Sequence, residues 1–470
     1  MNRYPPYASA ILALCLSASA WGQWSSDPGQ NTPLASVPNA AQVQPHIAAT
    51  SDGHWWISWF SRNPQSEPPI GYGVYLQHLD DKGTPQLAQQ GLAVARLGLN
   101  WFENHGLATE ASGNALLAFQ DDRSHPPARR ITAAKVSPQG GLLWGLRGVA
   151  PSSASGDQHA PLIVALPHGQ ALVGWTADKA VHLQQLDPKG RPSARATVLA
   201  APDAQYQLAD LQAAGDGSVL VSFVRSRGFA SPRYLYANRI GADGALLWGE
   251  DHVRVSEGSS LQMGNFPRLL PDGRGGAVFA WYGVAPRMQA QVQHILADGQ
   301  PAFAQNAVAA SSDLHQAAGE PAASYQPSTG EVTLFWVETG NAAQQRPQGL
   351  YAQKFDAQGA RQWGDGGRAL RLSQAPIGNL RSIAAADGTL VFWTEGGPGT
   401  AYNSIQAIKL DGAGVPLCPQ FAVSTRSSTK SRLAAGISGN GQMLLAWEEQ
   451  TEEPGSTIYM QSVRADCTLS

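Results

Sequence analysis

The sequence is poor in charged residues. Only 14% of its 470 residues are Asp, Glu, Lys or Arg, and the formal net charge is −3. A nucleic-acid-binding protein needs a basic face that displaces counterions from phosphates, so this balance argues against that class. It also argues against long disordered stretches, because these usually carry a high net charge.

Long apolar runs are missing as well, so we expect no membrane-spanning helix. At the N-terminus, Arg3 precedes a mostly apolar segment at 8–17, which is too short to cross a bilayer. An A-x-A cleavage pattern follows at 18–20. These features predict a secretory signal at 1–20. The remaining chain, 21–470, is expected to be exported to the periplasm or outside the cell.

Cysteine is scarce. Without the signal, only Cys418 and Cys467 remain. An oxidising compartment would permit one disulfide between them. Two separate buried thiols are the alternative, and the sequence leaves both open because the Cα separation decides between them.

The common catalytic and metal-binding motifs are absent. The chain contains no H-E-x-x-H, G-x-S-x-G, P-loop or EF-hand pattern. Its 11 histidines are scattered without the spacing of metal ligands. We therefore predict no metal and no cofactor.

Turn residues and tryptophan are abundant, with Gly 50, Pro 32 and Trp 14, which favours an all-β protein. Eight times, a Gly or Asn turn leads into a short apolar run that ends in an aromatic residue. Successive copies lie 48 to 60 residues apart. The closing aromatics are Trp59, Phe119, Trp175, Phe223, Trp281, Trp336, Trp393 and Trp447.

Each repeat is predicted to form four antiparallel strands. The first is short and often opened by proline, and the second is apolar on both faces, as in a strand between two neighbouring sheets. The third is typified by 349–355, and a D-x-x-G turn then leads to a fourth strand that carries a tryptophan. This arrangement predicts β-propeller blades. The opening prolines are Pro45, Pro161, Pro267 and Pro321.

The two ends of the chain complement each other. In the last repeat Cys467 takes the place of the turn glycine, and no fourth strand follows before Ser470. Trp24 aligns with the tryptophan position, so a strand at about 21–38 is expected to complete the C-terminal blade. We predict a single all-β domain, an eight-bladed β-propeller, with seven blades as the alternative. A solenoid would instead need polar caps, and none is evident.

The stretch D-x-x-G-x-x-x-W-G at 356–364 resembles the hairpin repeats of secreted bacterial β-propeller proteins. It is similar in part to sialidase Asp-boxes, to the hairpins of BamB-like assembly scaffolds and to quinoprotein dehydrogenase repeats. Its spacing differs from the first and the last of these. The resemblance implies a fold rather than an activity.

One loop stands outside the repeat pattern. The segment 98–106 places Trp101, Phe102, Glu103 and His105 together. An aromatic platform with arginines and carboxylates would suit a sugar or an acidic glycan, and His105 with Glu103 or a nearby aspartate would suit acid–base chemistry. The alternative is solvated loops, local salt bridges and a hydrogen-bonded histidine. Further candidates for this ligand site are Asp121, Asp122, Arg123, Arg62, Arg225, Arg227, Tyr282 and Arg287.

These observations favour a noncatalytic, monomeric, exported propeller that binds a protein or a glycan, or that acts as a scaffold. A carbohydrate-active enzyme, either a polysaccharide lyase or a glycosidase, is the main alternative. A quinoprotein-like cofactor binder is a third.

Overall fold

The structure is a computed structural model that describes residues 24–470, apart from a set of short segments. Those segments are 36, 38, 63–70, 99–102, 124–128, 155, 256–257, 285–286, 305–306, 314–316, 340–347, 398–400 and 452–453. The segment 1–20 therefore lies outside the described residues. Within the described part the chain contains β-strands and one short 3-10 turn at Pro167–Gly169, and no α-helix.

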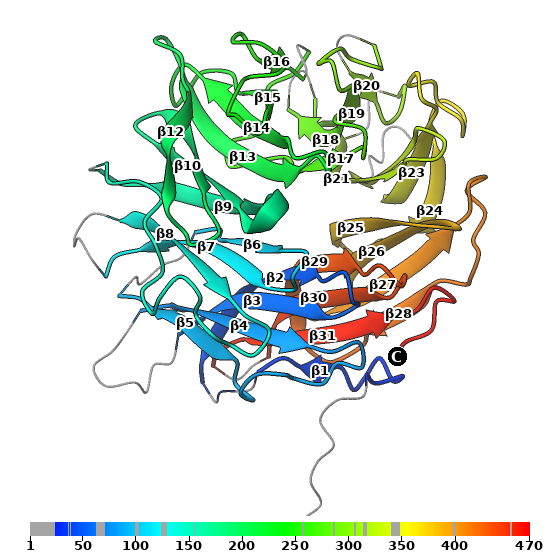
Figure 1. Cartoon of the computed structure of the whole chain (residues 1–470). Coiled ribbons are helices and arrows are strands. Elements are labelled where there is room, and N and C mark those ends of the chain that lie inside the picture. The colour runs from blue at the N-terminus through cyan, green and yellow to red at the C-terminus, as the bar shows by residue number, and fades with distance from the viewer. Residues whose placement is uncertain are drawn as a thin grey trace, which may run out of the picture.

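Eight antiparallel sheets form a ring, as predicted, and the seven-bladed alternative is excluded (Figure 1). The innermost strands are β2 (Ala41–Ala49), β6 (Gly106–Thr109), β9 (His159–Ala165), β13 (Gln205–Ala213), β17 (Leu269–Pro271), β21 (Ala317–Gln326), β25 (Ile377–Ala385) and β29 (Thr429–Ile437). The second strands are β3 (Trp55–Arg62), β7 (Ala115–Asp121), β10 (Ala171–Ala177), β14 (Val219–Ser226), β18 (Ala277–Gly283), β22 (Glu331–Thr339), β26 (Gly388–Gly396) and β30 (Met443–Gln450).

The outer half of each blade contains its third and fourth strands. The third strands are β4 (Gly73–Leu79), β8 (Arg130–Val136), β11 (Ala180–Leu186), β15 (Tyr234–Ile240), β19 (Gln289–Ile295), β23 (Gly349–Phe355), β27 (Asn403–Leu410) and β31 (Thr457–Val463). The fourth strands are β5 (Leu92–Arg96), β12 (Pro192–Leu199), β16 (Val253–Arg254), β20 (Val308–Ala309), β24 (Arg368–Leu372), β28 (Phe421–Ser424) and β1 (Thr32–Pro33). In blade 2, single bridges at Leu142 and Val149 replace the fourth strand.

The hydrophobic core lies between the blades rather than at the centre of the ring. Eight clusters of buried side chains each join one blade to the next, and one of them joins blade 8 to blade 1. All eight closing aromatics of the second strands are at most 2% exposed. Every residue of β7 is buried, which confirms that the second strand is covered on both faces.

The position predicted for the prolines was wrong in the long inner strands. Pro45, Pro161 and Pro321 were expected to open a strand, but β2, β9 and β21 begin two to four residues earlier. The register with the second strand shifts at each of these sites, and the residue before the proline has a positive φ. A β-bulge interrupts the ladder there, so proline is tolerated although it has no N–H to donate.

The D-x-x-G motif joins neighbouring blades. In "FDAQGARQWG", Asp356 Oδ1 accepts hydrogen bonds from the amides of Gln358 and Ala360 at 3.0 and 2.8 Å, which shapes the turn. Gly359 has φ 87°, and a Cβ there would lie 2.8 Å from Phe303 of the preceding blade. The glycine therefore provides both the turn conformation and the room for a neighbour's ring.

This contact is repeated around the ring. The residue four positions after each turn glycine was predicted to lie on the fourth strand. It lies before that strand instead, and its side chain packs against the turn of the next blade. Tryptophan also donates an indole N–H to that turn, as from Trp144 to Pro188 O at 3.0 Å. We call this contact the staple. The stapled pairs are Trp24–Gly83, Leu87–Gly140, Trp144–Gly190, Trp248–Gly299, Phe303–Gly359 and Trp363–Gly414.

A disulfide takes the place of one staple. Cys418 occupies the aromatic position of blade 7 and Cys467 the glycine position of blade 8, and the two are bonded with a Cα–Cα separation of 6.5 Å. Of the two alternatives that the sequence left open, the structure has the disulfide. Cys467 also adopts φ 69°, a value that suits the glycine of the other turns.

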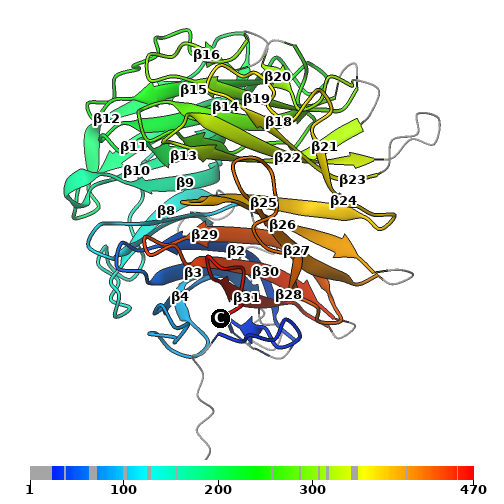
Figure 2. The ribbon, with the colours of Figure 1, turned by 90° about the vertical axis from the view of Figure 1, so that its right-hand side faces the viewer.

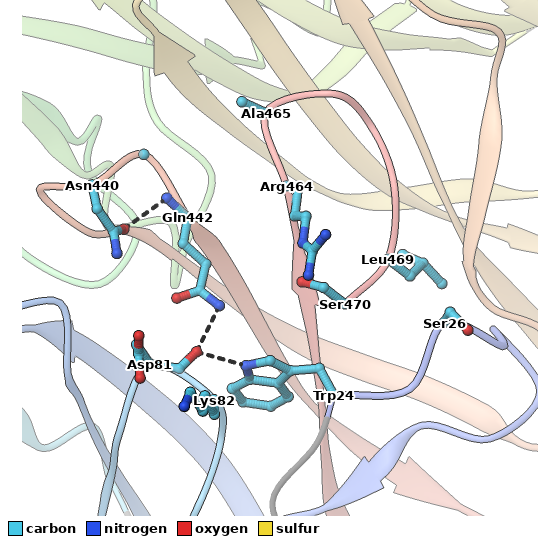
Figure 3. A pocket seen from close by; sticks show the side chains of 11 residues that line it. Trp24, Ser26, Asp81, Lys82, Asn440, Gln442, Arg464, Ala465, Leu469 and Ser470 are labelled. Carbon is cyan, nitrogen blue, oxygen red and sulfur yellow. Dashed lines mark hydrogen bonds between the residues drawn. The ribbon is translucent and has the colours of Figure 1, made fainter.

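The N-terminal strand completes blade 8, as predicted. β1 pairs antiparallel with β31, and the C-terminus lies beside the N-terminal strand in both views (Figure 1 and Figure 2). Trp24 then crosses to blade 1, where its indole N–H donates to Asp81 O at 3.1 Å (Figure 3). Gln442 Nε2 of blade 8 donates to the same oxygen at 2.9 Å. The junction of blades 8 and 1 is thus stapled like the others.

We predict that the disulfide can be exchanged for the common staple. The double variant Cys418→Trp/Cys467→Gly should melt at about the wild-type temperature and be indifferent to dithiothreitol. The wild type should lose about 2–4 kcal/mol of stability when it is reduced. Calorimetry with and without reductant measures both. The matched control is Cys418→Ala/Cys467→Gly, and a staple variant no more stable than this control would contradict the exchange.

Candidate functional site

A cavity of about 550 Å³ opens at one mouth of the central channel. The inner strands β9 and β13 contribute side chains near their N-terminal ends, and Phe266 comes from the loop before β17. The cavity therefore lies on the face that carries the connections between successive blades. Its lining combines acidic, amide, imidazole and apolar groups from Glu103, Asn104, His159, Ala160, Leu162, Thr176, Gln207, Leu208, Ala209 and Phe266.

Glu103 is the predicted site residue that lines this cavity. Its Oε1 lies 3.0 Å from His159 Nδ1, and its Oε2 accepts a hydrogen bond from the Ala160 amide at 3.0 Å. Both side chains of the Glu103–His159 pair are partly exposed to the cavity, at 26% and 38%. The carboxylate thus supports the bulge of the next blade, and together with the imidazole of His159 it faces the cavity.

The same support recurs elsewhere in the ring. Glu320 Oε2 accepts from the amide of Asn379 at 2.6 Å, and Glu448 Oε2 accepts from the amide of Gln44 at 3.4 Å. Each donor is a bulge residue with positive φ in the following blade. A carboxylate that accepts a hydrogen bond from a backbone N–H left unpaired at a bulge stabilises the fold. Part of the role of Glu103 is therefore architectural.

His105 follows the cavity-lining Asn104 in sequence and is fully buried. Its Nε2 is 2.8 Å from Ser58 Oγ, and its ring lies 4.3 Å from that of His46. Burial lowers the pKa of His105 to about 3. The imidazole is therefore neutral at physiological pH and shielded from a ligand. This position suits the alternative interpretation of the sequence, a hydrogen-bonded structural histidine, better than it suits an acid–base catalyst.

Asp121 and Arg123 form a local ion pair at the end of β7. Arg123 Nη2 lies 2.6 Å from Asp121 Oδ2, and the same carboxylate accepts from Thr132 Oγ1 at 2.8 Å. Burial alone would raise the pKa of Asp121, but hydrogen bonds and charge from Arg123 lower it below its usual value. Asp122 accepts from the Gly98 amide at 3.0 Å. None of these three lines the cavity.

The remaining predicted residues are dispersed over several blades. Arg225 and Arg227 both pair with Asp203, at 3.2 and 3.1 Å. Tyr282 donates to Gln262 Oε1 at 2.7 Å. Arg62 ends β3, and Arg287 is exposed in the loop before β19. Trp101 and Phe102 lie outside the described residues, next to Glu103.

Sequence reasoning missed His159, Gln207 and Phe266. The first two lie on inner strands whose polar positions follow no repeat pattern, and Phe266 lies in a connecting loop. One signal was available, because the proline of Ala160-Pro161 aligns with that of Gln44-Pro45 and marks the bulges around the channel mouth.

A metal centre and a membrane-spanning helix are two features that would define the class of site. The described residues contain no group of three His, Cys, Asp or Glu side chains that could hold a metal ion. Among these same residues, no helix has the length and apolar character that crossing a bilayer requires.

Comparisons with known proteins assign this chain to no family. No protein-family model matches the chain, and no curated protein matches it significantly. Similar solved structures include the Dos1 propeller, 10% identical over 91% of this chain and 95% of that chain, with a TM-score of 0.48. The polysaccharide lyase Uly1 is 9% identical over 96% and 93%, with a TM-score of 0.47. A mutant NanB sialidase from Streptococcus pneumoniae is 9% identical over 96% and 71%, with a TM-score of 0.38. Likenesses of this size carry no information on activity.

The burial of His105 predicts a loss of stability in acid. Its folded-state pKa of about 3 lies below the unfolded value, so unfolding takes up a proton between these two values and stability falls as the pH falls through this window. From pH 7 to pH 5 this one group should cost about 2 kcal/mol. Burial also lowers the pKa of His46, which adds in the same direction.

Urea unfolding at the two pH values measures this loss in the wild type and in His105→Gln. The variant should lose about 2 kcal/mol less between pH 7 and pH 5, whatever its stability at pH 7. The exposed His168→Gln is the control and should behave as the wild type. An equal loss in His105→Gln and the wild type would contradict the assignment.

Proposed function

We propose that this protein is an exported, noncatalytic propeller that binds a glycan at the channel mouth, as a binding module of the cell envelope or the extracellular space. The single observation that carries the proposal is the cavity beside Phe266. Its volume of about 550 Å³ lies within the range of small-ligand sites and suits one or two sugar rings.

The cavity lining has the chemistry of sugar recognition. Phe266 is 40% exposed and offers an apolar ring face against which a pyranose can stack. Asn104 and Gln207 supply amide groups, and the Glu103–His159 pair supplies a charged acceptor and a ring nitrogen. A few polar groups beside one aromatic surface fix the orientation of a ligand that is itself both apolar and polar.

Two further features support this proposal. The signal predicted at 1–20 and the disulfide both suit an oxidising, exported location. The groups first considered for catalysis have structural partners, because His105 is buried against Ser58 and Asp121 is paired with Arg123.

Binding should depend on Phe266. A glycan array probed with residues 21–470 identifies the ligand, and titration calorimetry then measures the affinity of any hit. Phe266→Ala should weaken binding about tenfold, equivalent to about 1.4 kcal/mol. Phe229→Ala is the matched control, because Phe229 is 80% exposed and does not line the cavity. No binding to any glycan would overturn the glycan reading and leave a protein partner.

The alternative, a polysaccharide lyase or glycosidase, is favoured by one observation. The Glu103–His159 pair at 3.0 Å faces the cavity, and such a pair can move a proton at a bound sugar. If this function holds, the wild type shortens the bound glycan, and Glu103→Gln lowers kcat at least about 100-fold, a much larger effect than its weakening of glycan binding. Chromatography of the glycan after long incubation decides, and an intact glycan contradicts the enzyme.

A further inference from the structure

Three basic side chains from separate blades lie on or beside the innermost strands, which surround the axis of the ring. Arg268 directly precedes β17 of blade 5, Arg381 lies in β25 of blade 7, and His46 lies in β2 of blade 1. These blades are not neighbours, but the innermost strands of all eight blades surround the axis of the ring (Figure 1). Burial is the largest cause of the lowered pKa of both Arg381 and His46, and the charge of Arg268 contributes to both, so the three groups lie within range of one another's charges.

Arg381 is held in a costly position. Its Nη1 donates to Leu380 O at 2.7 Å, but its Nε is buried without a hydrogen-bond partner. Burial, and after it the charge of Arg268, lowers the pKa of Arg381 to about 10, against the favourable charge of Glu320. A buried cation is destabilising unless an anion pairs with it.

The nearby carboxylates are engaged with other donors. Asp210 accepts from the amides of Leu211 and Leu269 at 2.8 and 2.9 Å and from Gln212 Nε2 at 3.1 Å.

Glu320 accepts from the backbone of the next blade, as described above. Within the described part of the chain, neither Arg268 nor Arg381 forms an ion pair with a carboxylate.

We propose that the channel binds an anionic group of the ligand, a carboxylate or a sulfate, between Arg268 and Arg381. This inference rests on the proposed function and narrows its ligand to an acidic glycan. Arg268 follows Phe266 by two residues in one loop, so the anion site adjoins the cavity. Each guanidinium group can donate two parallel hydrogen bonds to two oxygens of a planar carboxylate or a tetrahedral sulfate.

The test uses sodium sulfate and sodium D-glucuronate as probes of residues 21–470, with sodium chloride at equal ionic strength as reference. Both probes should raise the Tm of the wild type, because an anion that binds the folded state stabilises it. Sulfate also stabilises proteins by exclusion from their surface, and that general part should be the same in every variant. The probe with the larger specific effect identifies the anionic group.

Arg268→Gln and Arg381→Gln should each lose the specific part of the Tm rise. Arg195→Gln on β12 is the matched control, since Arg195 is exposed on an outer strand, and it should keep the rise. Without probe, Arg381→Gln should melt above the wild type, because it removes a cation whose Nε is buried without a partner and which the charge of Arg268 repels. A Tm below the wild type, or a probe response equal to the wild type in both channel variants, would overturn the proposal.

The array separates this inference from the proposed function. Neutral glycan hits together with no specific probe effect would overturn the anion site and leave the binding module. A specific probe effect that both channel variants lose, together with an array without hits, would support the anion site. It would overturn the proposal that the anionic group belongs to a glycan.

Discussion

The contact between an apolar side chain and a turn glycine of the next blade holds this ring together. Phe303 on Gly359 shows why it works, since any Cβ at the glycine would lie within 2.8 Å of the ring. The contact extends the core between the blades to the edge of the molecule and fixes how two sheets lie relative to each other. Third-strand side chains reinforce it by donating to the same turns of the next blade, from Arg239 to Ala297 O, Lys354 to Gly412 O and Lys409 to Ala465 O.

The two junctions that flank blade 8 show how the ring closes, one through a substitute for this contact and one through the contact itself. Between blades 7 and 8 the disulfide of Cys418 and Cys467 replaces the aromatic and the glycine together. Between blades 8 and 1 the staple is supplied from the other end of the chain, by Trp24 on Gly83. These contacts lie in the hairpin turns between third and fourth strands, so they leave the loops of the proposed binding site unengaged.

The repeat was predictable because its signals are local. A turn glycine, an apolar run and a closing aromatic recur in each blade, and a strand between two sheets must be apolar on both faces. The candidate site was only partly predictable. Glu103 was found because its loop departs from the repeat, whereas His159 and Phe266 carry no local signal. Asp121 and Arg123 looked like ligand groups, but they lie two residues apart on one strand end and neutralise each other.

The sequence by itself determined that the chain is a repeat of four-stranded blades and that the two ends complement each other, and it favoured eight blades over seven, because each of these follows from spacing along the chain. Only the tertiary structure decided which polar residues meet. His46, Arg268 and Arg381 are more than one hundred residues apart in sequence and share no motif. They become neighbours because a closed ring brings the inner strands of all its blades to one axis, where burial and charge act across the channel.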